Sequence, residues 1–397
     1  MSSTPQTELR SEDLRAALGR WLKVEVTGLE RIGGGRNSQV YKVTVEVEGG
    51  GLEGLKELKK LNGLKELNGL REGGGAGDSV LESERFALKI YFRHPNDQRD
   101  RLATEFNSFS YLWANGIRDV PQPLAHDPGP GWALYQFIEG EKVPPGQASD
   151  AQLLAAADFL GRLRELSRRP KGRKLGLASE ACLAPQLIVE NVRARLERLR
   201  GELPPKSTIK KTPNYEELRE FLDREFAPLL AEVSRWSEAG LRAAGMSFAE
   251  ELDWALRTLS PSDFGFHNAL RQPDGRIIFL DFEYFGWDDP AKMIADFLLH
   301  PAMNLSANSK RTFAAAIFRR FSDWPGLANR VAGVYPLFGL KWCTIMLNEF
   351  LPDSYLRRQF AAATAVDRST LQLQQLDKAR QLLLRIRQEY QSFPYCD

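Results

Sequence analysis

The sequence contains few of the residues that build disulfide frameworks or cysteine-ligated metal centres. It has only three cysteines in 397 residues, Cys182, Cys343 and Cys396, and they lie far apart. An odd number without metal-ligand spacing is typical of reduced thiols in a cytoplasmic protein. The first twenty residues are polar and lack the apolar core of a signal peptide. We therefore expect a cytoplasmic location.

Long apolar runs and an excess of one charge are also missing. The most apolar stretch, residues 331–347, is interrupted by Lys341 and falls short of a membrane span. The 54 basic and 52 acidic residues nearly cancel, and no basic run lies beside aromatic residues. We expect no membrane and no nucleic-acid partner, and the sequence leaves the oligomeric state open.

What the sequence has in quantity is apolar residues and length, which favour an α+β protein of two lobes. Hydrophobic residues make up 43% of the chain, enough for a sizeable core. Alternating, β-branched runs predict strands at residues 24–32, 39–47 and 85–93, and residues 97–117 have helical spacing. A Gly/Pro-rich connector follows, so we place an N-lobe at residues 1–138 and a mainly helical C-lobe at 139–397.

Residues 49–78 form a leucine- and glycine-rich insert between two of the predicted strands. Leucine recurs there at every third residue, a period that drifts around a helix instead of forming one stripe. We interpret the segment as a low-complexity extension of a hairpin, with a partner-binding element as the alternative, and assign it no chemistry.

The stretch "SPSDFGFHNAL" contains Asp263-Phe264-Gly265, the tripeptide whose aspartate binds magnesium in protein kinases. A second aspartate, Asp281, ends the predicted strand "IIFLDF", and Asn268 follows Asp263 by five residues. Phosphoryl transfer needs one carboxylate at the attacking hydroxyl and separate oxygen ligands for magnesium. We therefore predict that Asp263 is the catalytic residue, that Asn268 and Asp281 bind the metal, and that the tripeptide is a coincidence.

The first lobe carries residues suited to a nucleotide. Glycines between two strands let backbone N–H groups approach phosphate oxygens. Lys89 lies mid-strand, where its ammonium group needs phosphate oxygens and a carboxylate as partners, and Glu105 on the next predicted helix is the best-placed carboxylate. The residues near 136–139 could pair with adenine through their backbone. The predicted ATP-binding set is Gly33, Gly34, Gly35, Asn37, Ser38, Lys89, Glu105, Gln136 and Ile138.

From Gly33 to Asp296 the chain resembles the aminoglycoside phosphotransferase and choline kinase family, small-molecule kinases of the protein-kinase-like fold. The segments that carry the resemblance are "GGGRNSQVYKV", "FALKIY", "SDFGFHNAL" and "LDFEYFGWDDPAKMIAD". The resemblance implies a bilobal kinase that uses ATP and Mg²⁺ to phosphorylate a small-molecule alcohol. It also implies Lys89 on the phosphates, Asp263 in catalysis, and Asn268 and Asp281 on magnesium.

The chain departs from the family pattern beside the catalytic aspartate. Pro261 and Ser262 precede that aspartate, whereas the family usually has a histidine two residues before it. Met293 occupies a position, three residues after the Asp-Pro pair, at which the family often has an aspartate, and Asp296 follows later in this chain. His267 could be a base, but a histidine in such a loop is more often a structural donor.

Two other functions stay open. A protein kinase is disfavoured because only seven residues separate Asp281 from Asp289, which leaves no room for an activation segment. A pseudoenzyme that binds nucleotide or acts as an interaction module is favoured by Pro261 and Ser262, and disfavoured by the retained acidic residues.

The acceptor is predicted only by class. Glu283, Asp288 and Asp289 alternate with aromatic residues, which suits an amino or quaternary-ammonium alcohol, although the same pattern also suits packing and solvation. Aminoglycosides and sugars remain alternatives.

Overall fold

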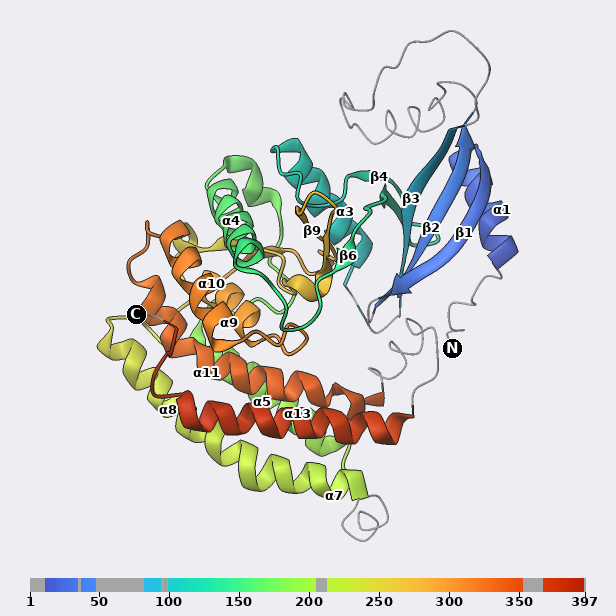
Figure 1. Cartoon of the computed structure of the whole chain (residues 1–397). Coiled ribbons are helices and arrows are strands. Elements are labelled where there is room, and N and C mark those ends of the chain that lie inside the picture. Colours follow the sequence, from blue (N-terminus) through green and yellow to red (C-terminus); the bar gives the residue numbers. More distant parts are fainter. Residues whose placement is uncertain are drawn as a thin grey trace. The chain divides into compact units, whose positions relative to one another are not determined.

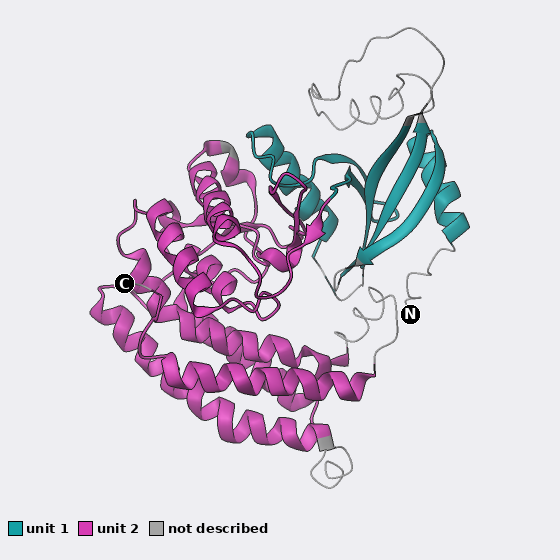
Figure 2. Cartoon of the chain, in the orientation of Figure 1, with its two compact units in different colours: residues 1–139, 357–363 teal, residues 140–356, 364–397 magenta. Residues whose placement is uncertain are grey.

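The computed structural model describes residues 11–34, 37–47, 82–93, 97, 99–204, 213–352 and 367–395. Figure 1 traces the chain with its helices and strands labelled. The insert at residues 49–78 and Gly35 lie outside the described residues. The described residues divide into two compact units, the first ending at Glu139 and the second beginning at Gly140 (Figure 2).

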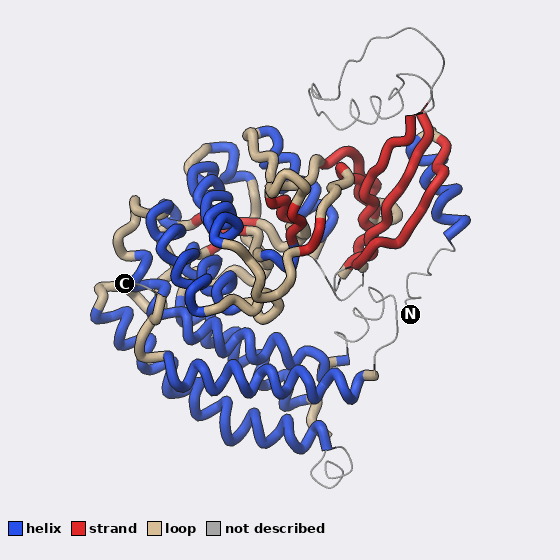
Figure 3. The backbone as a smooth tube through the Cα atoms, in the orientation of Figure 1, coloured by secondary structure: helices blue, strands red, loops and turns tan. Residues whose placement is uncertain are grey.

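The first unit is built on one antiparallel sheet of five strands, drawn in red in Figure 3. In spatial order the strands are β1 (Glu25–Gly34), β2 (Ser38–Val47), β3 (Glu82–Tyr91), β5 (Trp132–Gln136) and β4 (Pro123–Asp127). Val47 at the end of β2 is paired with Glu82 at the start of β3. The chain between these two residues therefore leaves and re-enters the sheet at neighbouring positions.

Alternation along β3 separates a core face from a polar face. Phe86, Leu88 and Ile90 join the apolar core beneath α1 (Ser11–Leu22), whose buried leucines recur every four residues. Lys89 and Tyr91 point to the opposite face, where α3 (Arg101–Ala114) packs on β4 and β5. The sheet thus places Lys89 on the side that α3 covers.

The second unit is mainly helical, as the sequence predicts. Its longer helices are α4 (Asp150–Ser167), α5 (Pro185–Gly201), α7 (Pro213–Glu220), α8 (Ala227–Ala243), α9 (Pro290–Leu299), α10 (Ala307–Arg320), α11 (Leu327–Met346) and α13 (Arg368–Glu389). A π-helical turn, Phe221–Phe226, joins α7 to α8, and a 3₁₀ turn, Leu347–Phe350, follows α11.

Helix α11 lies at the centre of the second unit and packs against α5, α8, α9 and α13. Its apolar residues cover most of its circumference, so the helix is buried all round. This is the apolar stretch of the sequence, and its burial explains its composition. None of the described helices is long and apolar enough to cross a membrane.

Short strands of the second unit carry its polar loops. β7 (Thr258–Ser260) pairs with β10 (Gly286–Asp288), and β8 (Ala269–Arg271) lies between β6 (Glu141–Lys142) and β9 (Ile277–Phe279). Each of them is held by pairing, because two or three residues are too few to be stable as isolated strands. The α+β prediction is confirmed: an antiparallel sheet precedes a mainly helical remainder.

Candidate active site

In the first unit, Lys89 forms a buried ion pair with the helix residue predicted from the sequence. Lys89 Nζ lies 2.5 Å from Glu105 Oε2, and the two residues are 6% and 2% exposed. The Tyr91 hydroxyl donates to the same carboxylate oxygen over 2.8 Å and lies 2.7 Å from the Tyr135 hydroxyl. Burial, together with the nearby Glu105 carboxylate, raises the pKa of Tyr91, so its hydroxyl remains a donor. The network fixes the ammonium group on the polar face of β3.

The predicted glycine turn connects β1 to β2. Gly33 and Gly34 pair with Val40 and Gln39 at the ends of the two strands, and Gly35 lies outside the described residues. Asn37 and Ser38 are buried, and the Asn37 carbonyl accepts a hydrogen bond from the Phe92 backbone over 2.7 Å. The beginning of β2 is thereby held against the end of β3. Phosphate binding by this turn stays a prediction.

The predicted adenine-binding residues lie at the end of the same sheet. The backbone N–H of Gln136 donates to the Gln122 carbonyl over 2.8 Å, while its side chain is exposed. Ile138 follows in the connection and is half-buried. Adenine recognition by either residue stays a prediction.

In the second unit, Asp263 lies in the loop after β7, and the loop is anchored by its neighbours. Phe264 is 4% exposed and stacks on Phe159, with ring centroids 5.6 Å apart. A Cβ atom at Gly265 would lie 2.4 Å from Met303 Sδ, so this position requires glycine for close packing. Local packing therefore accounts for the phenylalanine and glycine of the Asp-Phe-Gly sequence.

Two histidines hold the carboxylate of Asp263. The Nε2 atoms of His267 and His300 each lie 3.2 Å from Asp263 Oδ1, and their rings stack at 3.7 Å with planes 8° apart. Desolvation would raise the pKa of Asp263, but the hydrogen bonds from both imidazoles outweigh it and hold the pKa well below its usual range. The carboxylate is therefore ionised at neutral pH.

The same three side chains place their ligand atoms within 4.8 Å of one another, close enough to hold a metal ion. The stacking argues against that use. A metal ion binds imidazole in the plane of the ring, and one ion cannot lie in the planes of two stacked, nearly parallel rings. Hydrogen bonding of His267 and His300 to Asp263 is the arrangement that the geometry favours.

The two predicted metal ligands are connected through the backbone. The N–H of Leu280 donates to the Asn268 carbonyl over 2.8 Å, which places Asp281 directly after this bond. The amide nitrogen of Asn268 donates to the Asp263 carbonyl over 3.1 Å, so its Oδ1 is the atom suited to a cation. Asp281 adopts a positive φ of 66°, which aspartate tolerates better than most residues. An amide oxygen and a carboxylate are ligands that suit Mg²⁺.

The three carboxylates predicted to contact the acceptor are all buried, and two of them form ion pairs with buried basic side chains of the same unit. Asp288 lies 2.8 Å from Lys292 Nζ, and Asp289 lies 2.6 Å from an Arg330 guanidinium nitrogen. Asp289 also caps α9 by accepting from the Ala291 backbone. Glu283 is 3% exposed. The acceptor role stays a prediction, although Asp288 and Asp289 have structural tasks that the sequence analysis did not assign.

Lys292 links α9 to the loop that holds Asp263 and was missed from the sequence. Its Nζ lies 3.0 Å from Asp296 Oδ2 and donates to Ser262 Oγ over 3.1 Å, in addition to its pair with Asp288. Burial would lower the pKa of Lys292, but the two carboxylates raise it above its usual value. The spacing of four residues from Lys292 to each aspartate was the signal that could have revealed this cluster.

A profile of the phosphotransferase enzyme family, APH, matches residues 75–329, more than half of the chain. The chain belongs to this phosphotransferase family. The family assignment made from sequence is therefore confirmed, and it includes the segment that holds Lys89, Asp263, Asn268 and Asp281. A comparison with curated proteins finds no match.

Solved structures of other phosphotransferases share the fold. Spectinomycin phosphotransferase APH(9)-Ia, in complex with ADP and spectinomycin, has a TM-score of 0.55 at 12% identity, covering 93% of this chain and 99% of that one. The gentamicin complex of APH(2")-IIa has a TM-score of 0.52 at 14% identity, covering 98% of this chain and 100% of that one. A choline/ethanolamine kinase family protein from Mesorhizobium loti gives 0.51, 17%, 96% and 99%. The chain thus has the protein-kinase-like fold of small-molecule kinases.

Proposed function

We propose that this phosphotransferase moves the γ-phosphoryl group of ATP, with Mg²⁺, to a hydroxyl group of a small molecule. The observation that carries the proposal is the Asp263 carboxylate, held ionised by two imidazoles and hydrogen-bonded through its backbone to Asn268. An ionised carboxylate can accept a hydrogen bond from a hydroxyl group and orient its oxygen for attack.

Residues of the first unit are proposed to bind the nucleotide. The ion pair with Glu105 and the hydroxyl of Tyr91 fix Lys89 on the polar face of β3, where its ammonium group can contact phosphate oxygens. The backbone of the β1–β2 turn is proposed to bind phosphate oxygens as well.

Asn268 Oδ1 and the Asp281 carboxylate are proposed to hold magnesium, which when bound neutralises charge on the phosphate oxygens. In the reaction, the acceptor oxygen forms a bond to the γ-phosphorus as the bond from that phosphorus to the oxygen of ADP breaks. The hydroxyl proton passes to Asp263. Because its pKa is held low, Asp263 is a weak base, so we expect it to act mainly by orienting the hydroxyl group.

The test combines product detection with nucleotide binding. The wild-type chain is incubated with ATP, Mg²⁺ and a panel of amino alcohols, aminoglycosides, sugars and anionic alcohols, and phosphorylated products are detected by mass spectrometry. Asp263→Asn should lower turnover by a factor on the order of 10² or more and leave the affinity for Mg-ATP nearly unchanged. Asp281→Asn should instead weaken Mg-dependent ATP binding in isothermal titration.

Asp274→Asn is the matched control, because Asp274 is an exposed aspartate in the turn between β8 and β9. It should change neither measurement. ATP binding without any product across the panel would favour a nucleotide-binding module over an enzyme. If Asp263→Asn and Asp281→Asn lose Mg-ATP binding equally, Asp263 is a metal ligand and the proposed division of roles is wrong.

A further inference from the structure

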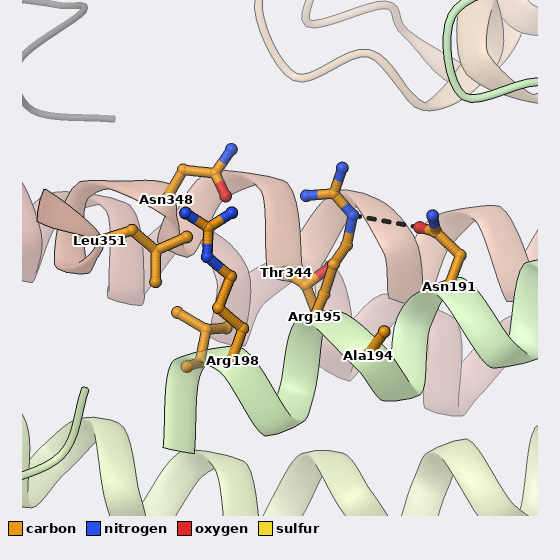
Figure 4. A pocket seen from close by; sticks show the side chains of 8 residues that line it. Asn191, Ala194, Arg195, Arg198, Thr344, Asn348 and Leu351 are labelled. Carbon is orange, nitrogen blue, oxygen red and sulfur yellow. Dashed lines mark hydrogen bonds between the residues drawn. The ribbon is translucent and has the colours of Figure 1, made fainter. Parts of the chain in front are cut away.

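A cavity of about 240 Å³ lies in the second unit, between α5 and the end of α11 with the 3₁₀ turn that follows (Figure 4). Among the described residues that line it, the charged ones are both arginines, Arg195 and Arg198, and none is acidic. The remaining lining residues are Asn191, Ala194, Leu199, Thr344, Asn348 and Leu351. Two guanidinium groups are complementary to a phosphate or carboxylate group.

Arg195 and Arg198 lie three residues apart on α5, and their guanidinium groups project from the same side of the helix in Figure 4. Arg195 is held in place: its Nε donates to Asn191 Oδ1 over 3.1 Å, and its Nη2 contacts both oxygens of Glu180 at 2.8 and 2.7 Å. A fixed guanidinium loses less conformational entropy when it binds a ligand.

Glu180 does not cancel the positive charge beside Arg195. Lys341, which is 4% exposed on α11, lies 3.2 Å from the same Glu180 carboxylate that contacts Arg195. Arg195 and Lys341 thus share one carboxylate, and these three side chains together carry a net positive charge. An amino or quaternary-ammonium group would be repelled there, whereas an anion would be attracted.

Two short series of contacts connect this cluster to the catalytic loop. Ser179, which precedes Glu180, accepts a hydrogen bond at its carbonyl from Ser262 Oγ over 3.4 Å, next to Asp263. Trp342, which follows Lys341, meets the His300 ring edge-on with centroids 4.5 Å apart, and His300 contacts Asp263. The arginine cluster and the residue proposed to orient the hydroxyl are therefore built on adjoining segments.

We propose that the acceptor of this phosphotransferase is an alcohol that carries a phosphate or carboxylate group, and that Arg195 and Arg198 bind this group. The inference rests on the proposed function and names the class of its acceptor substrate. The sequence suggested a cationic acceptor instead, on the basis of acidic residues. Two of these residues, Asp288 and Asp289, already pair with Lys292 and Arg330.

The first experiment measures anion binding by the full chain. Inorganic phosphate is titrated into the wild type, Arg198→Gln and Arg198→Lys at low ionic strength, with Arg193→Gln as a control. Arg193 is exposed on the same helix and does not line the cavity. Arg198→Gln should weaken binding on the order of tenfold, Arg198→Lys should weaken it less, and Arg193→Gln should not change it. Equal affinity of the wild type and Arg198→Gln for phosphate would overturn the site.

The second experiment tests the substrate class with ATP, Mg²⁺ and four acceptors: glycerol 3-phosphate, glycerate, glycerol and choline. Phosphorylation of the first or the second, with KM raised on the order of tenfold by Arg198→Gln and kcat little changed, supports the inference and distinguishes phosphate from carboxylate. Turnover of choline or glycerol, unaffected by Arg198→Gln, overturns it while the proposed function stands. Phosphate binding that depends on Arg198, without turnover of any acceptor in either panel, overturns the substrate role and counts against the proposed function as well.

Discussion

The buried Lys89–Glu105 pair should show a large energetic coupling that an exposed pair of the same sheet lacks. Removing one member leaves the other charge buried, at 6% or 2% exposure, so Lys89→Met or Glu105→Gln should each destabilise the first unit by about 3–5 kcal/mol. The double variant leaves no uncompensated charge, and its cost should be smaller than the sum of the two single costs. We therefore expect a coupling of about 2–3 kcal/mol from the double-mutant cycle.

The matched control is the Lys42–Glu30 pair on β2 and β1, at 3.1 Å with side chains 30% and 66% exposed. Its coupling should not exceed about 1 kcal/mol, because water screens both charges. Urea denaturation at pH 7, followed by circular dichroism and tryptophan fluorescence, measures both cycles. Similar couplings for the two pairs would refute the reasoning that burial makes the Lys89 pair strong.

Three further changes test burial, close packing and loop length. Lys310 is 4% exposed, and burial together with the nearby Arg385 lowers its pKa to about 8. The free energy of unfolding of the wild type should therefore rise between pH 8 and 10.5 by up to about 3 kcal/mol relative to Lys310→Met. Gly286→Ala should destabilise the protein by several kcal/mol, because the added Cβ would lie 2.4 Å from backbone atoms of residues 177 and 178. In contrast, Gly240→Ala should stabilise α8 by up to about 1 kcal/mol, because a Cβ there meets no atom within 4 Å. Replacing residues 50–77 by a short glycine-serine turn should leave folding and ATP binding intact.

The sign of the Lys310 effect follows from proton binding. Between pH 8 and 10.5 the unfolded chain binds the proton that the folded chain has released, so stability increases with pH in that window. A pH-independent difference between wild type and Lys310→Met in urea denaturation would contradict it. For Gly286→Ala, thermal melting that equals that of Gly240→Ala would contradict the close contact. Loss of ATP binding after the loop replacement would show that the insert is structural.

Much of the fold was predictable because its signals are local. Alternation over residues 39–47 and 85–93 predicts β2 and β3, and the helical spacing after residue 97 predicts α3. Helix α1 was missed because the first twenty residues are polar on average, although Leu14, Leu18 and Leu22 recur at a helical period. The strands β7 and β8 were missed because three residues carry no period, and only their pairing partners define them.

The residues of the candidate site also divide into those with a local signal in the sequence and those that only the fold brings together. Asp263, Asn268 and Asp281 could be singled out because their chemistry and spacing lie within one short segment. His300 could not be predicted, because its contact with Asp263 arises from the packing of α9, far along the chain. The pairing of Lys89 with Glu105 was predicted from the cost of a buried ammonium, but Tyr91 and Tyr135 emerge only when the strands are aligned.

The double anchorage of Asp263 has an entropic consequence. Two imidazoles, one from its own loop and one from the end of α9, restrict rotation of the carboxylate before any substrate arrives. The rotational freedom of this side chain is therefore lost when the protein folds, and substrate binding does not have to remove it again. Releasing one anchor by His300→Ala would let the carboxylate sample more rotamers, so a smaller fraction of molecules would present it correctly oriented at any moment.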